Sequence, residues 1–377
     1  MKPLGIAFIG YGSIGRVHAM GYRSLPFLYG LDHDAVRIIG AATAHAESAQ
    51  AAARELGCDV WSDDYRVLLE REDVDVVDIC TPNAAHLQPV LDAAAAGKHI
   101  YCEKPLGLTV TEARRMVDAV EWAGVKHQVT FHNRFVPAVL RARQLLDQGF
   151  VGDVFSFQSR YHRSSYVDPN KPISWKLRME TSGGGALVDL GAHALDLLRY
   201  LLGDVAAVRA TLRTLIPQRP AAPGSSQLVP VDVDDFALLE LRMASGAFGT
   251  MEASRVATGA TNDMGFEIYG SKGALRYNFA DPNWLYAYSL DAAGAPISGQ
   301  RGFTRIETIQ RYPGAHSPDW TAPTGFVRAH AECQYRFLRA IWDDSAPAPD
   351  MVDGLRVQEI MAAAQRSDEE QRWVELT

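Results

Sequence analysis

One glycine-rich stretch constrains the fold more than any other part of the sequence. Residues 10–15 read Gly-Tyr-Gly-Ser-Ile-Gly, follow an apolar run at residues 4–9 and precede a segment of helical character at residues 16–24. A G-x-G-x-x-G sequence between a strand and a helix is the context in which this motif binds a dinucleotide. Glycine-rich turns also arise for purely structural reasons, so the surrounding pattern has to decide between the two interpretations.

Each glycine of this turn has a physical task. The first permits a tight turn, the second lets a pyrophosphate approach the backbone, and the third lets the helix pack closely on the strand. The helix N-terminus then offers backbone N–H groups and the positive end of its dipole to the phosphates. We therefore predict that the cofactor's phosphates lie against Gly10, Tyr11, Gly12, Ser13, Ile14 and Gly15.

Strands and helices alternate after this turn. Such alternation, with helices of ten or more residues, predicts a doubly wound parallel sheet covered on both faces, a Rossmann domain over residues 1–130. The predicted strands are residues 4–9, 36–42, 74–80, 99–102 and 126–131, and the helices between them are residues 47–56, 83–96 and 110–122. Residues 61–70 are expected to form a connection and a short helix.

The pattern changes over residues 131–377, which we expect to form an α+β domain. Strand-like runs follow one another, and short turns at residues 244–246 and 270–273 predict hairpins and therefore an antiparallel sheet. The predicted strands are residues 154–162, 205–216, 236–242, 248–255, 266–269, 274–279 and 285–290. The predicted helices are residues 137–148, 186–202, 326–342 and 355–364, and residues 217–230, rich in Pro and Gly, are expected to be a surface loop.

Composition excludes several classes of function. The 377 residues are enough for two domains, and the net charge of −8 argues against a nucleic-acid or anionic-membrane partner. No apolar run is long enough to span a membrane, and the N-terminal apolar run is too short for a signal peptide. The four cysteines contain no C-x-x-C pair, so we expect buried thiols, no disulfide, no metal site and a cytoplasmic location.

Three polar stretches follow predicted strands at their carboxyl ends. They are residues 81–86, with Thr81, Asn83 and His86, then residues 103–105 and residues 132–134. In a doubly wound sheet the ligand crevice lies outside the carboxyl ends of the strands, so all three fall on the side of the glycine turn. Each alone is an ordinary loop, but their convergence on one edge favours a binding site.

One helix of the second domain carries a polar stripe. Residues 183–185 are three glycines, and the predicted helix over residues 186–202 ends at Gly203. Asp189 and His193 are four residues apart, so they project from the same face one turn from each other. Asp196 and Tyr200 continue the stripe and are interpreted as helix-face or interdomain residues.

At this point the sequence resembles a known family, the Gfo/Idh/MocA oxidoreductases. The resemblance rests on residues 10–15, Thr-Pro-Asn at 81–83 with His86, Gly-Lys-His at 97–99 with Glu-Lys-Pro at 103–105, and residues 183–193. It implies a Rossmann domain followed by a domain with a large open sheet. It also implies a nicotinamide cofactor, a sugar or cyclitol substrate, and homodimers or homotetramers built through that sheet.

The resemblance also implies roles for single residues. Lys104 would be the active-site lysine, His193 the acid/base and Asp189 its substrate-binding partner. The residues expected to line the cofactor or lie near it are Thr81, Asn83, His86, Glu103, Lys104, Asn133 and Trp175. Residues 325–330 resemble a subset of the family that acts on sugars such as glucose or its anhydro form, and loops 161–176 and 314–330 would select the sugar.

Elementary chemistry supports these roles. An alcohol with a pKa near that of water, about 15.7, is about nine units above histidine, so a free alkoxide costs on the order of 12 kcal/mol. Proton removal should therefore accompany hydride departure, with a neutral His193 as base and the Lys104 ammonium stabilising the oxyanion. The alternatives are a buried structural histidine and a surface lysine at these positions.

The end of the second strand departs from the usual NAD pattern. Thr43, Ala44 and His45 stand where an acidic residue usually holds the ribose hydroxyls. Asp32 and Asp34 precede the strand and are expected at its other end. We assign Thr43 to the cofactor and NAD as the cofactor, with NADP not excluded.

Two other functions remain compatible with the sequence. One is a non-catalytic nucleotide-binding regulator of the same fold, which would have no need of Lys104, Asp189 and His193 together. The other is an enzyme that uses bound NAD for transient oxidation, either to eliminate a leaving group or to pass hydride between two sugars. Product analysis separates the second alternative from net oxidation.

Overall fold

The computed structural model describes residues 2–292, 294, 299–308, 314 and 325–376. Its contacts divide the chain into two compact units. One is Met1–Phe135 with Arg311–Gln358, and the other is Val136–Gln310 with Glu359–Thr377. Among the described helices, none combines the length and the hydropathy needed to cross a membrane.

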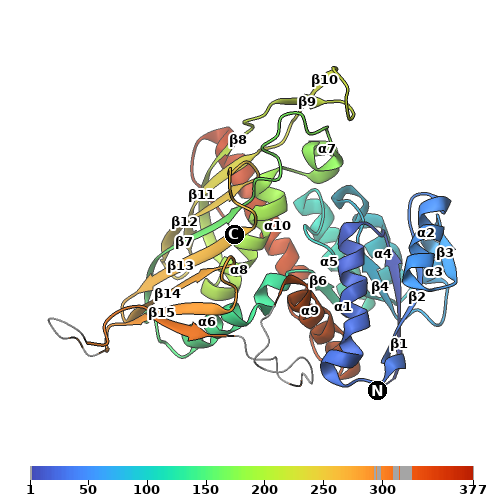
Figure 1. Cartoon of the computed structure of the whole chain (residues 1–377), viewed down its shortest axis with the longest axis horizontal. Coiled ribbons are helices and arrows are strands. Elements are labelled where there is room, and N and C mark those ends of the chain that lie inside the picture. Colours follow the sequence, from blue (N-terminus) through green and yellow to red (C-terminus); the bar gives the residue numbers. More distant parts are fainter. Residues whose placement is uncertain (1, 293, 295–298, 309–313, 315–324, 377) are drawn as a thin grey trace. The chain divides into compact units, whose positions relative to one another are not determined.

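The first unit is built on a six-stranded parallel sheet in the order β3-β2-β1-β4-β5-β6, flanked by helices (Figure 1). The strands are β1 Leu4–Ile9, β2 Val36–Ala42, β3 Val60–Ser62, β4 Val76–Ile79, β5 His99–Cys102 and β6 His127–Val129. This strand order is that of a dinucleotide-binding sheet, so the predicted Rossmann fold is confirmed. The prediction missed β3, because three residues are too few to show a periodic pattern.

The helices of this unit mostly lie where the sequence places them. They are α1 Ser13–Tyr29, α2 Ala46–Leu56, α3 Arg66–Leu69, α4 Leu87–Ala95, α5 Val110–Ala123 and α9 Phe326–Trp342, with 3₁₀ turns at His33–Ala35, Asn83–Ala85 and His132–Phe135. Helix α9 packs on α1, where the rings of Tyr29 and Tyr335 stack 3.5 Å apart. Because of this packing, Arg311–Gln358 belongs to the first unit, which differs from the predicted division at 130/131.

The second unit contains a nine-stranded sheet in the order β16-β15-β14-β13-β7-β12-β11-β8-β17. The strands are β7 Val154–His162, β8 Val205–Arg213, β11 Phe236–Met243, β12 Phe248–Ser254, β13 Asp263–Gly270, β14 Gly273–Asn278, β15 Trp284–Ser289, β16 Thr304–Glu307 and β17 Val374–Glu375. Only β7 and β12 pair in parallel, so the predicted large, mostly antiparallel sheet is confirmed. Helices of this unit lie along the sheet (Figure 1).

The expected surface loop at residues 217–230 contains a small sheet, so that part of the prediction is wrong. Strands β9 Gln218–Pro220 and β10 Leu228–Pro230 pair in antiparallel fashion. The side chain of Arg219 is buried and donates to the carbonyl oxygens of Tyr166 and Asp168 at 2.6 and 2.7 Å. These long-range hydrogen bonds hold the segment in place, and local composition carries no sign of them.

The helices of the second unit include one irregular element. They are α6 Pro137–Asp147, α7 Met179–Ser182, α8 Ala192–Leu202 and most of α10 Met351–Glu370, with a 3₁₀ turn at Trp175–Leu177 and a π-helical turn at Leu187–Gly191. The sequence predicts one continuous helix over residues 186–202. The first turn of that segment is π-helical instead, and it carries Asp189.

Candidate active site

The glycine turn between β1 and α1 has the geometry that a pyrophosphate requires. Gly10 has φ +84°, and a Cβ there would lie 2.8 Å from the backbone carbon of Cys80. At Gly12 a Cβ would meet nothing within 4 Å, so the space above this residue is open. No described side chain caps the N-terminus of α1 and its first turn holds no acidic residue, so its N–H groups face the place where phosphates would lie.

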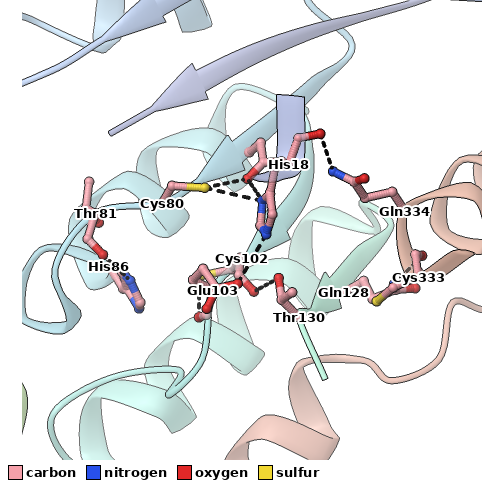
Figure 2. Close-up of polar contacts among 11 residues, drawn as sticks. His18, Cys80, Thr81, His86, Cys102, Glu103, Gln128, Thr130, Cys333 and Gln334 are labelled. Atoms are coloured by element: carbon pink, nitrogen blue, oxygen red, sulfur yellow. Dashed lines mark hydrogen bonds and ion pairs between the residues drawn. The ribbon is translucent and has the colours of Figure 1, made fainter. Parts of the chain in front are cut away.

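His86 joins the loop after β4 to the loop after β5. Its Nδ1 lies 2.9 Å from the carbonyl oxygen of Pro105 and its Nε2 lies 3.0 Å from that of Thr81 (Figure 2). Burial lowers the pKa of His86, since the backbone carbonyls around it carry no net charge that could offset the lost hydration. The imidazole therefore ties together the two loops that contain Thr81 and Lys104, with backbone carbonyls at both ring nitrogens.

The other predicted cofactor residues of this unit follow the carboxyl ends of its strands. Asn83 begins the 3₁₀ turn after β4, Glu103 and Lys104 follow β5, and Asn133 lies in the 3₁₀ turn after β6. Asn83, Glu103 and Asn133 are all buried. The structure thus brings these residues to the edge of the sheet on which Gly10 to Gly15 lie.

A buried histidine that the sequence analysis left unassigned lies beneath this edge. His18, on α1, has no exposed surface, and its Nδ1 lies 2.9 and 3.1 Å from the two carboxylate oxygens of Asp78 on β4. Its Nε2 lies 3.2 Å from Oε1 of Glu103. Figure 2 shows the contacts of the His18 imidazole with Cys80 and Glu103.

Cys80 completes this group of side chains. Its Sγ lies 3.1 Å from Oδ1 of Asp78 and 3.3 Å from Nδ1 of His18. Three ligands of a tetrahedral zinc ion would hold their donor atoms roughly 3.3–3.7 Å apart. The two separations to Asp78 are shorter than that and fit direct hydrogen bonds, and burial raises the pKa of the Cys80 thiol.

The end of β2 carries hydroxyls instead of a carboxylate. Thr43 Oγ1 donates to the carbonyl oxygen of His45 at 3.0 Å and lies 2.5 Å from Oγ of Ser48. Asp32 and Asp34 lie before β2, beside the 3₁₀ turn at His33–Ala35, and therefore at the amino end of the parallel sheet. Neither aspartate shares the edge where the glycine turn lies.

In the second unit, the π-helical turn carries Asp189 and α8 carries His193. A π-turn has more residues per turn than an α-helix, so a spacing of four residues still places both side chains near one face. Asp234 fixes the start of this segment, since its carboxylate accepts from the backbone nitrogens of Gly185 and Leu187 at 2.7 and 2.8 Å. A Cβ on Gly185 would lie 1.7 Å from the Asp234 carbonyl oxygen, so only glycine fits there.

Two cations surround the Asp189 carboxylate. Nζ of Lys176 lies 3.2 Å from Oδ1 and 3.4 Å from Oδ2, and Nη2 of Arg255 lies 3.5 Å from Oδ2. Arg255 is buried and also donates to the Lys176 carbonyl oxygen at 3.0 Å. Trp175, which the sequence places near the active site, is half-exposed beside Lys176, whose Nζ lies 5.6 Å from the centre of its ring.

His193 is buried and faces an aromatic ring. The centre of the Tyr161 ring lies 6.1 Å from that of His193, and the Tyr161 hydroxyl donates to Oδ1 of Asn262 at 2.8 Å. Burial raises the pKa of Tyr161 to about 12, which keeps this phenol neutral. His193 therefore has an apolar and uncharged neighbour on this side.

The predicted site residues fall into two groups. Trp175, Asp189 and His193 belong to the second unit, and the others belong to the first, so the predicted meeting of Lys104 with His193 stays a prediction. Residues 315–324 of the predicted sugar-selecting loop lie outside the described residues, whereas residues 325–330 begin at the N-terminus of α9.

Sequence reasoning missed several partners of these residues. They are His18, Asp78, Lys176, Asp234 and Arg255. Only Asp78 left a signal, because a charged residue within a buried strand requires a partner.

Comparison with known proteins identifies the family. Residues 4–131 match the model of the oxidoreductase family with an NAD-binding Rossmann fold, and residues 139–276 match the GFO/IDH/MocA C-terminal domain. Levoglucosan dehydrogenase of Pseudarthrobacter phenanthrenivorans is 35% identical over 392 residues, covering 100% of this chain and 99% of the relative. Inositol 2-dehydrogenase of Rhizobium meliloti is 30% identical over 371 residues, covering 98% of each chain.

A solved structure agrees over the full length. A levoglucosan dehydrogenase in complex with NADH and L-sorbose superposes with a TM-score of 0.93 at 34% identity, covering 100% of both chains. The glycine turn described above therefore belongs to a fold that is known with NADH. The chain belongs to the GFO/IDH/MocA family of oxidoreductases and is an NAD-dependent dehydrogenase.

Proposed function

We propose that this dehydrogenase oxidises a secondary alcohol of a sugar, a sugar derivative or a cyclitol. The observation that carries this proposal is that Lys104, Asp189 and His193 occur together in a chain that aligns end to end with a levoglucosan dehydrogenase. Levoglucosan and inositols, which the names of two relatives indicate as substrates, are the first candidates. The resemblance of residues 325–330 to a sugar-oxidising subset of the family supports the same choice.

The cofactor would lie along the carboxyl edge of the first sheet. Residues 10–15 and the N-terminus of α1 would bind the phosphates, and Thr43 and Ser48 would face the adenosine ribose. The residues proposed to line the nicotinamide half are Thr81, Asn83, His86, Glu103, Lys104 and Asn133, with Trp175 nearby. When bound, the nicotinamide ring supplies the hydride acceptor.

The protein's own side chains would handle the proton. His193 would accept the hydroxyl proton as hydride leaves the carbon, and the ammonium of Lys104 would stabilise the negative charge that develops on oxygen. Asp189 would accept a hydrogen bond from a substrate hydroxyl, while Lys176 and Arg255 hold its carboxylate in place. No step requires a metal ion.

A substrate panel tests the proposal. The purified protein is incubated with levoglucosan, neutral hexoses and inositols, each with NAD and with NADP, while NADH or NADPH formation and the sugar products are followed. We expect net NADH formation and a keto-sugar or inosose with at least one polyol. The absence of turnover with every polyol, or a changed sugar without net NADH, would contradict this function, and the latter would indicate transient oxidation.

We also propose the assembly and location expected for such an enzyme. The nine-stranded sheet exposes Leu238 and Phe248, which favours a homodimer or homotetramer formed through that sheet. All four cysteines are free thiols, which is compatible with a reducing cytoplasmic compartment. Light scattering on the wild type and on Leu238→Lys tests the assembly: we expect an oligomer that the substitution weakens, whereas a monomeric wild type would contradict it.

A further inference from the structure

Both ring nitrogens of His18 face carboxylate oxygens. Nδ1 lies 2.9 Å from Asp78 and Nε2 lies 3.2 Å from Glu103. A neutral imidazole has one N–H and one lone pair, so in its neutral form one of these contacts would set a lone pair against a carboxylate. An imidazolium donates to Asp78, keeps a second N–H in ion-pair contact with Glu103, and balances one of the two buried negative charges.

Four other titratable groups near His18 are neutral, so none of these four supplies the positive charge beside Asp78. Burial raises the pKa of the thiol and phenol groups nearby and lowers the pKa of His330 well below its usual range. These groups are Tyr22 on α1, Cys80 on β4, Tyr101 on β5 and His330 on α9. Burial alone would lower the pKa of His18, but the charge of Asp78 and its hydrogen bonds raise it well above its usual range.

His86 provides the contrast within the same unit. It is also fully buried with both ring nitrogens near oxygen acceptors, but those acceptors are backbone carbonyls without net charge. Its pKa is lowered by burial, whereas that of His18 is raised. The difference follows from the charge and hydrogen bonds of Asp78 at His18 and not from the depth of burial.

The position of His18 connects two parts of the cofactor site. It lies three residues after Gly15, on the first turns of the helix whose N-terminus would bind the phosphates. Glu103, its partner at Nε2, directly precedes Lys104 at the end of β5 (Figure 2). The backbone of His18 is fixed in turn, since Gln334 on α9 donates to its carbonyl oxygen at 3.0 Å.

We propose that His18 is a positioning residue that, as a buried imidazolium, joins the phosphate-binding helix to Glu103 and so fixes the strand end that carries Lys104. This inference rests on the proposed function, because it concerns the placement of the lysine that acts on the alcohol. His18 is fully buried, so its effect on cofactor and substrate would be indirect. Its effect passes through Glu103, so removing either partner should displace the same segment.

The protonation state of His18 is measurable without any substrate. Full-length protein with ¹⁵N-labelled histidine is titrated by NMR between about pH 6 and 8, and comparison with His18→Gln assigns the His18 signals. We expect both ring nitrogens of His18 to stay protonated across this range, beyond the usual histidine pKa of about 6.5. A neutral tautomer of His18 at pH 7 would overturn the proposal, whether or not the enzyme turns over any polyol.

A double-mutant cycle tests the positioning role. NADH affinity and kcat are measured for His18→Gln, Glu103→Gln and the double variant, with His99→Gln as control, since His99 begins β5 at the opposite end of the strand. We expect each single substitution to lower kcat or NADH affinity roughly 10- to 100-fold, with no further loss in the double variant. Additive losses, or a wild-type kcat and affinity in Glu103→Gln, would overturn the proposal.

The two experiments also separate this inference from the proposed function. A wild type that oxidises no polyol would refute the proposed function, while the NMR titration and the NADH affinities would still decide the role of His18. If His18→Gln does not fold, which circular dichroism shows, the NADH affinity and kcat of Glu103→Gln decide instead.

Discussion

At the scale of single residues, the carboxylate of Asp189 is held by positively charged side chains. Its carboxylate is held by a half-exposed lysine and a buried arginine, Lys176 and Arg255. The arginine is anchored by a backbone carbonyl, so its position is fixed, whereas the lysine is 39% exposed and can exchange its contact with Asp189 for one with a ligand. We therefore propose that Asp189 adjusts to a sugar hydroxyl through its contact with Lys176.

A substitution of this lysine should affect substrate binding more than turnover. In Lys176→Gln, Asp189 loses one of its two cations and the hydrogen bonds that orient it, so we expect KM for the polyol to rise roughly fivefold, which corresponds to about 1 kcal/mol. Steady-state kinetics with the best polyol of the panel measures it. Lys171→Gln is the matched control, since Lys171 lies in the same segment and donates to the Ser165 carbonyl oxygen. An unchanged KM would mean that Asp189 is oriented by Arg255 alone.

From the contact between His18 and Glu103 we predict how the stability of the protein depends on pH. The pKa of His18 is raised, so its contribution is fully present below about pH 6.5 and is lost only as the pH rises through the raised value. The pKa of Glu103 is lowered, in spite of burial, by the hydrogen bond and charge of His18, so its contribution is lost only as the pH falls through that lowered value.

Denaturant unfolding of wild type and His18→Gln between about pH 5 and 10 measures this contribution. We expect a loss of about 3–5 kcal/mol at neutral pH, because the substitution leaves buried carboxylates without their cation, and a smaller difference at the alkaline end. A difference that disappears near the usual histidine pKa would instead indicate an unperturbed imidazole.

At the scale of elements, the turn between β1 and α1 offers a position where a substitution should affect cofactor binding but not stability. A Cβ at Gly12 would meet no protein atom within 4 Å, and the backbone there has φ −99°, which any residue adopts. If the phosphates occupy this open space, a larger side chain should fit the free protein and exclude them.

Gly12→Val therefore should leave the melting temperature close to that of the wild type and weaken NADH binding at least about tenfold. Calorimetry and fluorescence titration with NADH measure the two quantities. Gly302→Val is the control, because a Cβ at Gly302 also meets nothing within 4 Å and this residue lies in the second unit. Undiminished NADH binding by Gly12→Val would show that the phosphates lie elsewhere.

The elements also show where sequence reasoning works. Strands β1, β2, β5 and β7 and helix α9 have the predicted bounds, because apolar or β-favouring residues mark the strands and helical periodicity marks the helix. The π-helical turn before α8 was predicted as α-helix, since it is set by Asp234 from another part of the chain. Local patterns carry no sign of such a partner.

At the scale of the whole molecule, the sequence predicts which residues line an edge better than which residues meet. The order of strands brings Gly12, Thr81 and Lys104 to one edge, and this followed from alternation alone. The contacts of His18 with Asp78 and Glu103 join residues 60 and 85 positions apart and depend on side-chain packing that spacing does not encode. For the same reason, the sequence does not predict that α9 belongs to the first unit.

The central proposal is that Lys104 and His193 both act on one hydroxyl during hydride transfer. It is tested most directly by the single-turnover rate of NADH formation in Lys104→Ala, His193→Ala and the double variant. Lys98→Ala serves as control, since Lys98 donates to the carbonyl oxygens of Arg71 and Val74, away from the site.

We expect each single substitution to slow NADH formation roughly 10²- to 10⁴-fold, and the double variant to be about as slow as the slower single one, because groups that act as a unit are not additive. A wild-type rate in either single variant, with the fold intact, would contradict the account.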